Sequence, residues 1–124
     1  MIVIARMLRL LAVSVSLGCC APAWGQVNLG FLHNSSLAGL TEQDAVMLRG
    51  ALQAALSSQE PGSAFDWANP SSGSKGSVRL RQTYQWQDMP CRTLEIATTA
   101  HYKTFRDTYN VCQDPTGAWV PNGG

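Results

Sequence analysis

Residues 91–112 read CRTLEIATTAHYKTFRDTYNVC, two segments in which apolar and polar residues alternate, with a cysteine at each outer end. Alternation with a period of two is typical of antiparallel strands that bury one face. If Cys91 faces Cys112 across a hairpin, the apolar residues of both segments fall on one face, whereas a shift of one residue would separate them. The cysteines and the alternation therefore predict the same hairpin, with a four-residue loop at 100–103.

Further strands are expected on both sides of this hairpin. Residues 77–87 form a third alternating segment, in which Gln82 interrupts the apolar face, and a short strand is expected around 119–120 after a turn at 114–117. Strict alternation in the third segment assigns Val78, Leu80, Tyr84 and Trp86 to the buried face and Arg79, Arg81, Thr83 and Gln85 to the outer face.

A helix is predicted over residues 40–58. Thr41 can serve as the N-cap, and Asp44 three residues later closes a capping box. Pro61 and Gly62 prevent the helix from continuing. Apolar residues recur at spacings of three and four and form one stripe, which consists of Ala45, Leu48, Leu52, Ala55 and Leu56.

The segment that follows the helix, residues 65–76, is rich in Gly, Pro and Ser and is expected to be irregular. Phe65 and Trp67 are expected to fill the gap between helix and sheet. These elements predict an α+β fold in which one helix packs on a small three- to four-stranded antiparallel sheet. A single domain is expected at residues 40–121.

The first 25 residues have the three parts of a secretory signal: a basic start, a short apolar run, and small residues at the two positions that a signal peptidase recognises, in Ala23-Trp24-Gly25. Cleavage would leave a mature chain that starts at Gln26, with a flexible arm at 26–39. The sequence therefore predicts an exported protein of the periplasm or of the outer membrane and cell surface.

The cysteines are consistent with export. Cleavage after Gly25 removes Cys19 and Cys20 and leaves Cys91 and Cys112, which are expected to form a disulfide in an oxidising compartment. The alternative is lipoprotein processing at Cys19, which would leave Cys20 without a partner. Membrane association is expected only through this lipidation.

The charge of the chain is close to neutral. It has nine basic and eight acidic residues, and removal of Arg6 and Arg9 with the signal would change the net charge from +1 to −1. Proteins that bind nucleic acid carry a strongly basic surface. Nucleic acid is therefore not expected as a partner.

Several motifs of the chain occur in a fixed order. A helix opens with Leu40-Thr41-Glu42-Gln43-Asp44, and the segment Trp67-Ala-Asn-Pro-Ser-Ser-Gly73 follows. Cys91-Arg92 and then Cys112-Gln-Asp-Pro-Thr-Gly-Ala-Trp119 complete the order. In these motifs the chain resembles the bacterial surface-antigen family related to the rickettsial 17 kDa antigen. The resemblance implies an envelope or surface-associated protein and supplies no reaction.

The residues needed for catalysis are poorly placed. Nucleophilic catalysis requires a serine or cysteine beside a base, but His33 falls in the arm and His101 in the hairpin loop, where side chains are expected to be exposed. The sequence has no phosphate loop, dinucleotide fingerprint or metal-ligand cluster. No enzymatic activity, cofactor or metal is therefore expected.

Two charged residues fall on the buried face of the hairpin. Under the pairing above, Arg92 lies inward opposite Val111, and Asp107 lies inward opposite Ile96, too far from Arg92 for a direct ion pair. Both are expected to reach water at the sheet edge. The alternative is a functional cleft at the sheet margin.

The outer face of the sheet is the candidate binding surface. Arg79, Arg81 and Arg106 are expected there, either as solubilising residues or as contacts for an anionic envelope polymer or lipid headgroups. The function favoured by the sequence is a non-enzymatic exported envelope protein with a structural or interaction role, whose partner is an unknown envelope protein or an anionic envelope polymer. The alternative is a secreted binding or inhibitor module that uses the same face.

Overall fold

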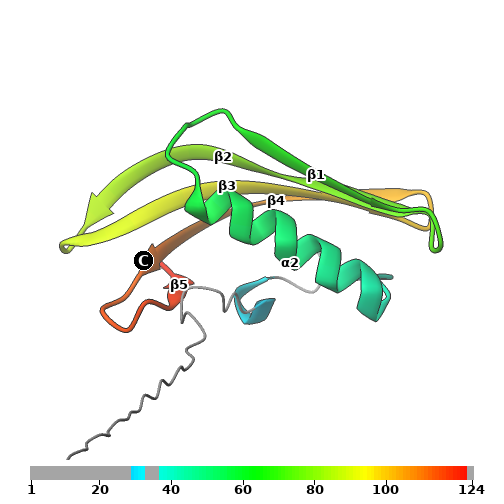
Figure 1. Ribbon diagram of the computed structural model, residues 1–124, viewed down its shortest axis with the longest axis horizontal. Coiled ribbons are helices and arrows are strands. Elements are labelled where there is room, and N and C mark those ends of the chain that lie inside the picture. Colours follow the sequence, from blue (N-terminus) through cyan, green and yellow to red (C-terminus); the bar gives the residue numbers. More distant parts are fainter. Residues whose placement is uncertain (1–28, 33–36, 123–124) are drawn as a thin grey trace, which may run out of the picture.

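A five-stranded antiparallel sheet forms one layer of the protein, and a long helix lies across one of its faces (Figure 1). This computed structural model describes residues 29–32 and 37–122. The sheet has the order β1-β2-β3-β4-β5, so it is a simple meander. The elements are α2 (Glu42–Ser57), β1 (Ala64–Asn69), β2 (Ser74–Trp86), β3 (Met89–Ala100), β4 (Lys103–Gln113) and β5 (Trp119–Pro121), preceded by the short helix η3 (Leu29–Phe31).

The expected signal segment, Cys19, Cys20, the start at Gln26 and His33 all lie outside the described residues. Part of the expected arm lies against the domain: Leu32 is buried in the core, and the rings of Phe31 and Tyr109 form a T-shaped contact with centroids 5.7 Å apart. Within the described ranges, none of the helices is long and apolar enough to span a bilayer.

Helix α2 begins as its sequence predicts. The side chain of Thr41 accepts a hydrogen bond from the backbone N–H of Asp44 at 3.0 Å, and the Asp44 carboxylate accepts one from the N–H of Thr41 at 2.9 Å. This capping box satisfies two backbone donors at the helix start. The buried stripe of α2 packs mainly on β1 and β2.

The expectation of an irregular segment at 65–76 is wrong. Residues 64–69 form strand β1, which pairs with β2 in the register Trp67↔Gly76 and Asn69↔Ser74. The Gly, Pro and Ser residues are concentrated in a four-residue turn, 70–73, so only that part is irregular. Phe65 and Trp67 do pack against the core, as expected, because they occupy alternate positions on the strand face that α2 covers. The sheet therefore has five strands, one more than the upper expectation.

The register of the central hairpin is confirmed. Cys91 pairs with Cys112, Leu94 with Tyr109, and Ile96 with Asp107. The hairpin is tighter than expected, because Ala100 and Lys103 still pair and the turn consists of His101 and Tyr102 alone. We call the face of the sheet that α2 covers the inner face, and the opposite one the outer face.

A bulge in β2 shows that the faces expected for residues 83–86 are wrong. Leu80 pairs with Leu94 and Gln82 with Thr93, so Arg81 is an extra residue in β2. A bulge of this kind reverses the alternation beyond it. Arg79 and Arg81 point outward as expected, whereas Tyr84 and Trp86 move to the outer face and Thr83 and Gln85 move to the inner face.

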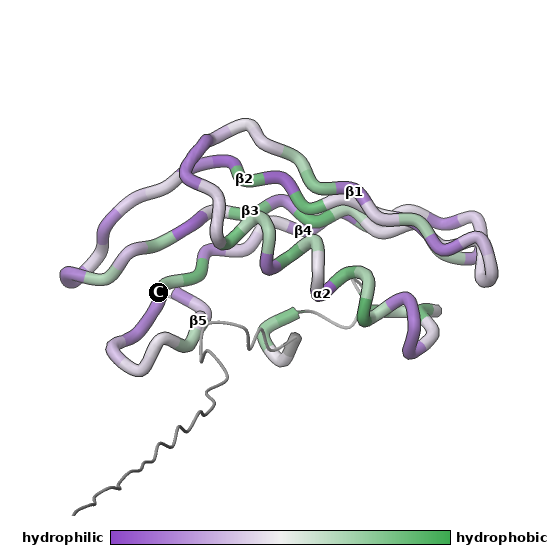
Figure 2. Tube along the Cα trace, viewed as in Figure 1, coloured by the Kyte–Doolittle hydropathy of each residue, from purple (hydrophilic) through white to green (hydrophobic). Residues whose placement is uncertain are grey.

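The core lies between α2 and the middle of the sheet. Figure 2 shows hydrophobic residues grouped where α2 meets the strands and hydrophilic residues at the hairpin ends. The large aliphatic side chains that are fully buried come from the helix and from three neighbouring strands: Leu48, Leu52, Val78, Leu80, Leu94, Ile96 and Val111.

The turn between β3 and β4 is strained. Both of its residues, His101 and Tyr102, have positive φ angles, +53° and +66°, and L-residues pay for that conformation. Tyr102→Gly is expected to raise the free energy of unfolding by about 0.5–1 kcal/mol, because glycine adopts this conformation freely and the Tyr102 side chain is fully exposed. Denaturant unfolding measures the change.

Tyr102→Ala is the matched control. It removes the same exposed ring but keeps the Cβ that makes positive φ unfavourable, so it should leave stability near that of the wild type. Equal stabilisation by alanine and glycine would show that the ring, and not the backbone, carries the strain.

Candidate binding face of the sheet

The outer face is open and carries more basic than acidic side chains. Helix α2 packs on the inner face, and no described element packs on the outer one in the contacts between elements. Strand alternation places six charged residues there, four basic and two acidic: Lys75, Arg79, Arg81, Arg106, Asp66 and Glu95.

At the middle of the outer face, two arginines share one carboxylate. Glu95 Oε1 lies 3.4 Å from Arg81 Nη1 and 3.9 Å from Arg79 Nε. Glu95 pairs directly with Arg79 in the register, and the bulge brings Arg81 to the same side. The arginine side chains are about half exposed, at 49% and 54%, so these ion pairs add little stability. They do, however, neutralise part of the positive charge of Arg79 and Arg81, which are proposed from the sequence as contacts for an anionic ligand.

Beyond this cluster, toward the turn at 101–102, basic charge is in excess: two cations, Lys75 and Arg106, lie on the same depression as one carboxylate, Asp66. Lys75 and Arg106 are exposed, and no carboxylate of the described residues lies within 4 Å of either cationic group. A shallow depression of about 500 Å³ opens beside them. Its lining comes from strands β1 to β4 and includes Asp66, Lys75, Ser77, Thr99, Thr104 and Arg106.

Sequence reasoning placed Arg106 on this surface but missed Lys75. The reason is that residues 65–76 were read as irregular, so Lys75 was not assigned to a strand face. The available signal was the alternation of Phe65 and Trp67 with Asp66 and Ala68, which marks a strand despite the glycines and prolines that follow.

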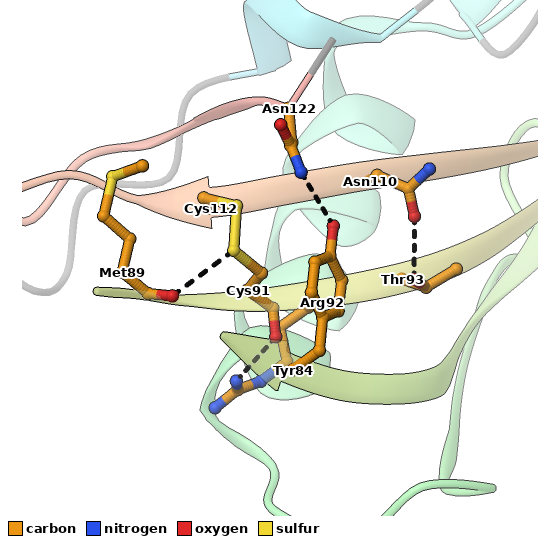
Figure 3. Close-up of a disulfide and its surroundings, with 8 residues drawn as sticks. All are labelled: Tyr84, Met89, Cys91, Arg92, Thr93, Asn110, Cys112 and Asn122. Atoms are coloured by element: carbon orange, nitrogen blue, oxygen red, sulfur yellow. Dashed lines mark hydrogen bonds between the residues drawn. A yellow bond between two sulfur atoms is a disulfide. The ribbon is translucent and has the colours of Figure 1, made fainter. Parts of the chain in front are cut away.

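The disulfide lies at the other end of the outer face. Cys91 and Cys112 are joined across β3 and β4, and both are buried, with exposed fractions of 0% and 1%. Figure 3 shows the Tyr84 ring beside this bond, where its hydroxyl accepts a hydrogen bond of 3.1 Å from Asn122 Nδ2. Thr93 Oγ1 donates to Asn110 Oδ1 at 2.7 Å in the neighbouring pair. The disulfide is buried, and hydrogen bonds join the neighbouring residues around it. This setting is typical of a structural disulfide.

A buried carboxylate joins α2 to the turn between β1 and β2. Asp44 is fully buried, and its Oδ1 accepts hydrogen bonds of 2.7 Å from both Asn69 Nδ2 and Ser72 Oγ. Burial alone raises the pKa of Asp44, but the hydrogen bonds from Thr41, Ser72 and Asn69 outweigh it and lower the pKa from 3.8 to about 2. A carboxylate that stays ionised and has its donors fixed in this way suits a structural role and not that of a general base.

This cluster explains the spacing of the motif Trp67-Ala-Asn-Pro-Ser-Ser-Gly73. Asn69 and Ser72 both bind Asp44, and Asn69 Oδ1 accepts from the N–H of Ser71 within the turn. Trp67 packs over Gly76, where an added Cβ would lie 2.6 Å from its indole Nε1 and 2.5 Å from the carbonyl oxygen of Ala97. The motif residues therefore hold the helix, the turn and two strands together.

The expectation that Arg92 reaches water at the sheet edge is wrong. Strand β3 is the central strand of five, so Arg92 is flanked by strands on both sides and is only 7% exposed. Asp107 lies on the inner face opposite Ile96 and is partly exposed. His101 is exposed in its turn. The described part of the chain contains no group of three or more His, Cys, Asp or Glu residues arranged to hold a metal ion.

Comparison with known proteins gives a consistent result. Residues 54–120 match the family described as 17 kDa outer membrane surface antigen. A protein of Rickettsia prowazekii (strain Madrid E) named 17 kDa surface antigen is 33% identical over 79 residues, which cover 63% of this chain and 50% of that protein. One of the same name from Rickettsia japonica is 31% identical over 83 residues, with coverage of 66% and 52%.

The chain thus spans about half the length of the curated relatives that it matches. No solved structure gives a significant match. The resemblance inferred from the sequence motifs is confirmed by the family match.

Proposed function

The chain belongs to the family of 17 kDa outer membrane surface antigens, and from this premise we propose that it is an exported, non-enzymatic protein of the cell envelope that acts through contacts made by its outer sheet face. The family name supports a place at the periplasm, outer membrane or cell surface. The Cys91–Cys112 disulfide supports an oxidising compartment, because such bonds are rare in the cytosol.

The observation that carries the interaction role is the excess of positive charge beside the shallow depression, where Lys75 and Arg106 form no ion pair and Asp66 is the one carboxylate among the described lining residues. A sheet holds such side chains at fixed spacing, so binding does not require a loop to be ordered. Two cations beside Ser77, Thr99 and Thr104 suit a polymer that carries carboxylates and hydroxyls. The ligand we propose is therefore an anionic polymer of the envelope, with peptidoglycan as the form to be tested.

A non-enzymatic role is supported by the state of the reactive groups. The Asp44 carboxylate is enclosed by its own hydrogen-bond donors, and both Cys91 and Cys112 are consumed by the disulfide. His101 lies in an exposed turn of strained backbone. None of these groups combines a nucleophile with a positioned base.

The proposal is tested by cosedimentation with isolated peptidoglycan at low salt. The variant Lys75→Ala/Arg106→Ala is expected to bind at least about fivefold more weakly than the wild type, since each cation near an anionic surface contributes ~1 kcal/mol. Raising the ionic strength to 0.15 M should weaken wild-type binding, because exposed charges are then screened. Anionic vesicles form a separate arm that asks whether lipid is the better ligand.

Two control variants sharpen the test. Arg49→Ala removes an exposed cation from α2, on the covered side of the sheet, and should bind as the wild type does. Arg79→Ala/Arg81→Ala removes the cations that Glu95 already balances and should have a smaller effect than the Lys75/Arg106 pair. Equal binding by the wild type and Lys75→Ala/Arg106→Ala, or no binding by either, would exclude this surface.

A further inference from the structure

Arg92 is a buried cation, and no carboxylate of the described residues pairs with it. Its guanidinium donates from Nη1 to the carbonyl oxygen of Cys91 at 3.0 Å, as Figure 3 shows, while its buried Nε has no hydrogen-bond partner in the described part of the chain. All eight acidic side chains of the sequence belong to described residues, and none of them forms an ion pair with Arg92. Burial lowers the pKa of Arg92. A buried charge in this condition is unfavourable unless something else binds it.

A pocket opens at this guanidinium. It has a volume of about 340 Å³ and lies where the inner face extends past the end of α2. Arg92 lines it together with Gln59, Thr83, Tyr84, Gln85 and Pro90. On a second side the ring of Trp119 lies 5.5 Å from Arg92 Cζ, a cation–π contact that holds the guanidinium in place.

The bulge at Arg81 is what makes this pocket polar. Without the extra residue, alternation would place Tyr84 and Trp86 on the inner face beside Arg92, and their rings would fill the space. With it, Thr83 pairs with Arg92 and Gln85 with Pro90, so that a hydroxyl and an amide face the pocket. Bulges are used in this way to redirect side chains beside functional sites.

We propose that this Arg92 pocket binds the carboxylate group of a small ligand. Among the described residues that line the pocket, Arg92 alone is charged, so the site matches one negative charge better than the two of a phosphate. The planar guanidinium suits a planar carboxylate. Its Nη2 makes no hydrogen bond to the described residues and, unlike Nε, is not fully buried, so this atom supplies a donor. Gln59, Thr83 and Gln85 add neutral hydrogen-bonding groups for the rest of the ligand. This site is on the opposite face from Lys75 and Arg106 and does not depend on the proposed function.

The test uses acetate as the probe and NMR of the disulfide-bonded protein as the readout. The Nε–H signal of Arg92 and the indole N–H signal of Trp119 are expected to shift saturably with acetate, with a dissociation constant on the order of 1–10 mM. Sodium chloride at equal ionic strength should give no saturable shift. Phosphate forms a second arm and is expected to bind at least about threefold more weakly than acetate.

Two variants assign the effect to the guanidinium. Arg92→Met is expected to abolish the saturable shift at Trp119 while leaving the melting temperature unchanged or higher, because replacing an unpaired buried charge by an apolar side chain is often stabilising. Arg92→Lys keeps the charge but loses the planar fork, and should weaken acetate binding about tenfold. Arg49→Met, on the exposed side of α2, should bind acetate as the wild type does.

Absence of a saturable acetate shift in the wild type overturns the proposal. So does an acetate shift that survives in Arg92→Met or is equal in Arg92→Lys. If Arg92→Met fails to fold, the Arg92→Lys comparison alone decides. Neither result bears on peptidoglycan binding, which is measured with variants of the other face.

Discussion

Replacing both Cys91 and Cys112 with serine is expected to lower the free energy of unfolding by about 3 kcal/mol. The disulfide closes a segment with a sequence separation of 21 residues, so its loss returns conformational freedom to the unfolded chain. The fold should survive, because the apolar faces of β3 and β4 specify the same register without the bond. Guanidinium unfolding monitored by circular dichroism gives the change.

The wild-type protein under reducing conditions is the matched control. It should lose stability to the same extent as the double serine variant, since both lack only the cross-link and differ little in volume. A loss below about 1 kcal/mol in both samples would mean that the bond adds little to the hairpin. Free thiols on both cysteines in protein isolated from its native envelope would contradict the disulfide itself.

Local sequence rules predicted the elements whose determinants are local. The start of α2 follows from Thr41 and Asp44, three residues apart, and the central hairpin follows from two alternating segments of which each is self-consistent. A shift of one residue in the helix start or in the hairpin register would expose apolar side chains to water, so few other arrangements are compatible with the sequence.

The bulge in β2 was not predicted, because the alternation of apolar and polar residues within one strand does not indicate the position of an unpaired extra residue. The sequence did carry a sign of it: Gln82 falls in a position that strict alternation assigns to the core. In the structure the pairing shifts between Leu80 and Gln82, and Gln82 is thereby exposed. Which residue becomes the bulge depends on the partner strand, which is not local information.

The Arg92 pocket depends on still more distant information. The sequence correctly placed Arg92 inward and opposite Val111. Its burial, however, follows from the strand order, which makes β3 the central strand, and from Trp119 and Gln59, which lie near Arg92 but far apart in the sequence. Only the assembled sheet brings these residues together.

Asp44→Asn is expected to lower the free energy of unfolding by about 2–3 kcal/mol at pH 7. The two oxygens of Asp44 accept from different donors: Oδ1 from Asn69 and Ser72, and Oδ2 from the N–H of Thr41. Asparagine has one oxygen and one amino group, so in either orientation its amino group faces a donor. Both the helix cap and the link from α2 to the β1–β2 turn are weakened.

The same carboxylate makes stability depend on pH. Its pKa is about 2 in the folded protein, against the ordinary value of 3.8, so the unfolded chain binds the proton more readily than the folded one. The stabilisation is therefore complete above about pH 4 and is lost as the pH falls from about 4 to 2. Urea unfolding across this range should show a steeper decline for the wild type than for Asp44→Asn, whose side chain does not titrate.

Glu42→Gln is the control for this comparison, because it removes a carboxylate from the same first turn of α2 but from an exposed position. It should change stability by only a few tenths of a kcal/mol through the helix dipole, and its decline between pH 4 and 2 should follow that of the wild type. Parallel declines of the wild type and Asp44→Asn would mean that other carboxylates account for the acid sensitivity. The buried cluster would then hold α2 to the sheet by geometry alone, with no contribution from its charge.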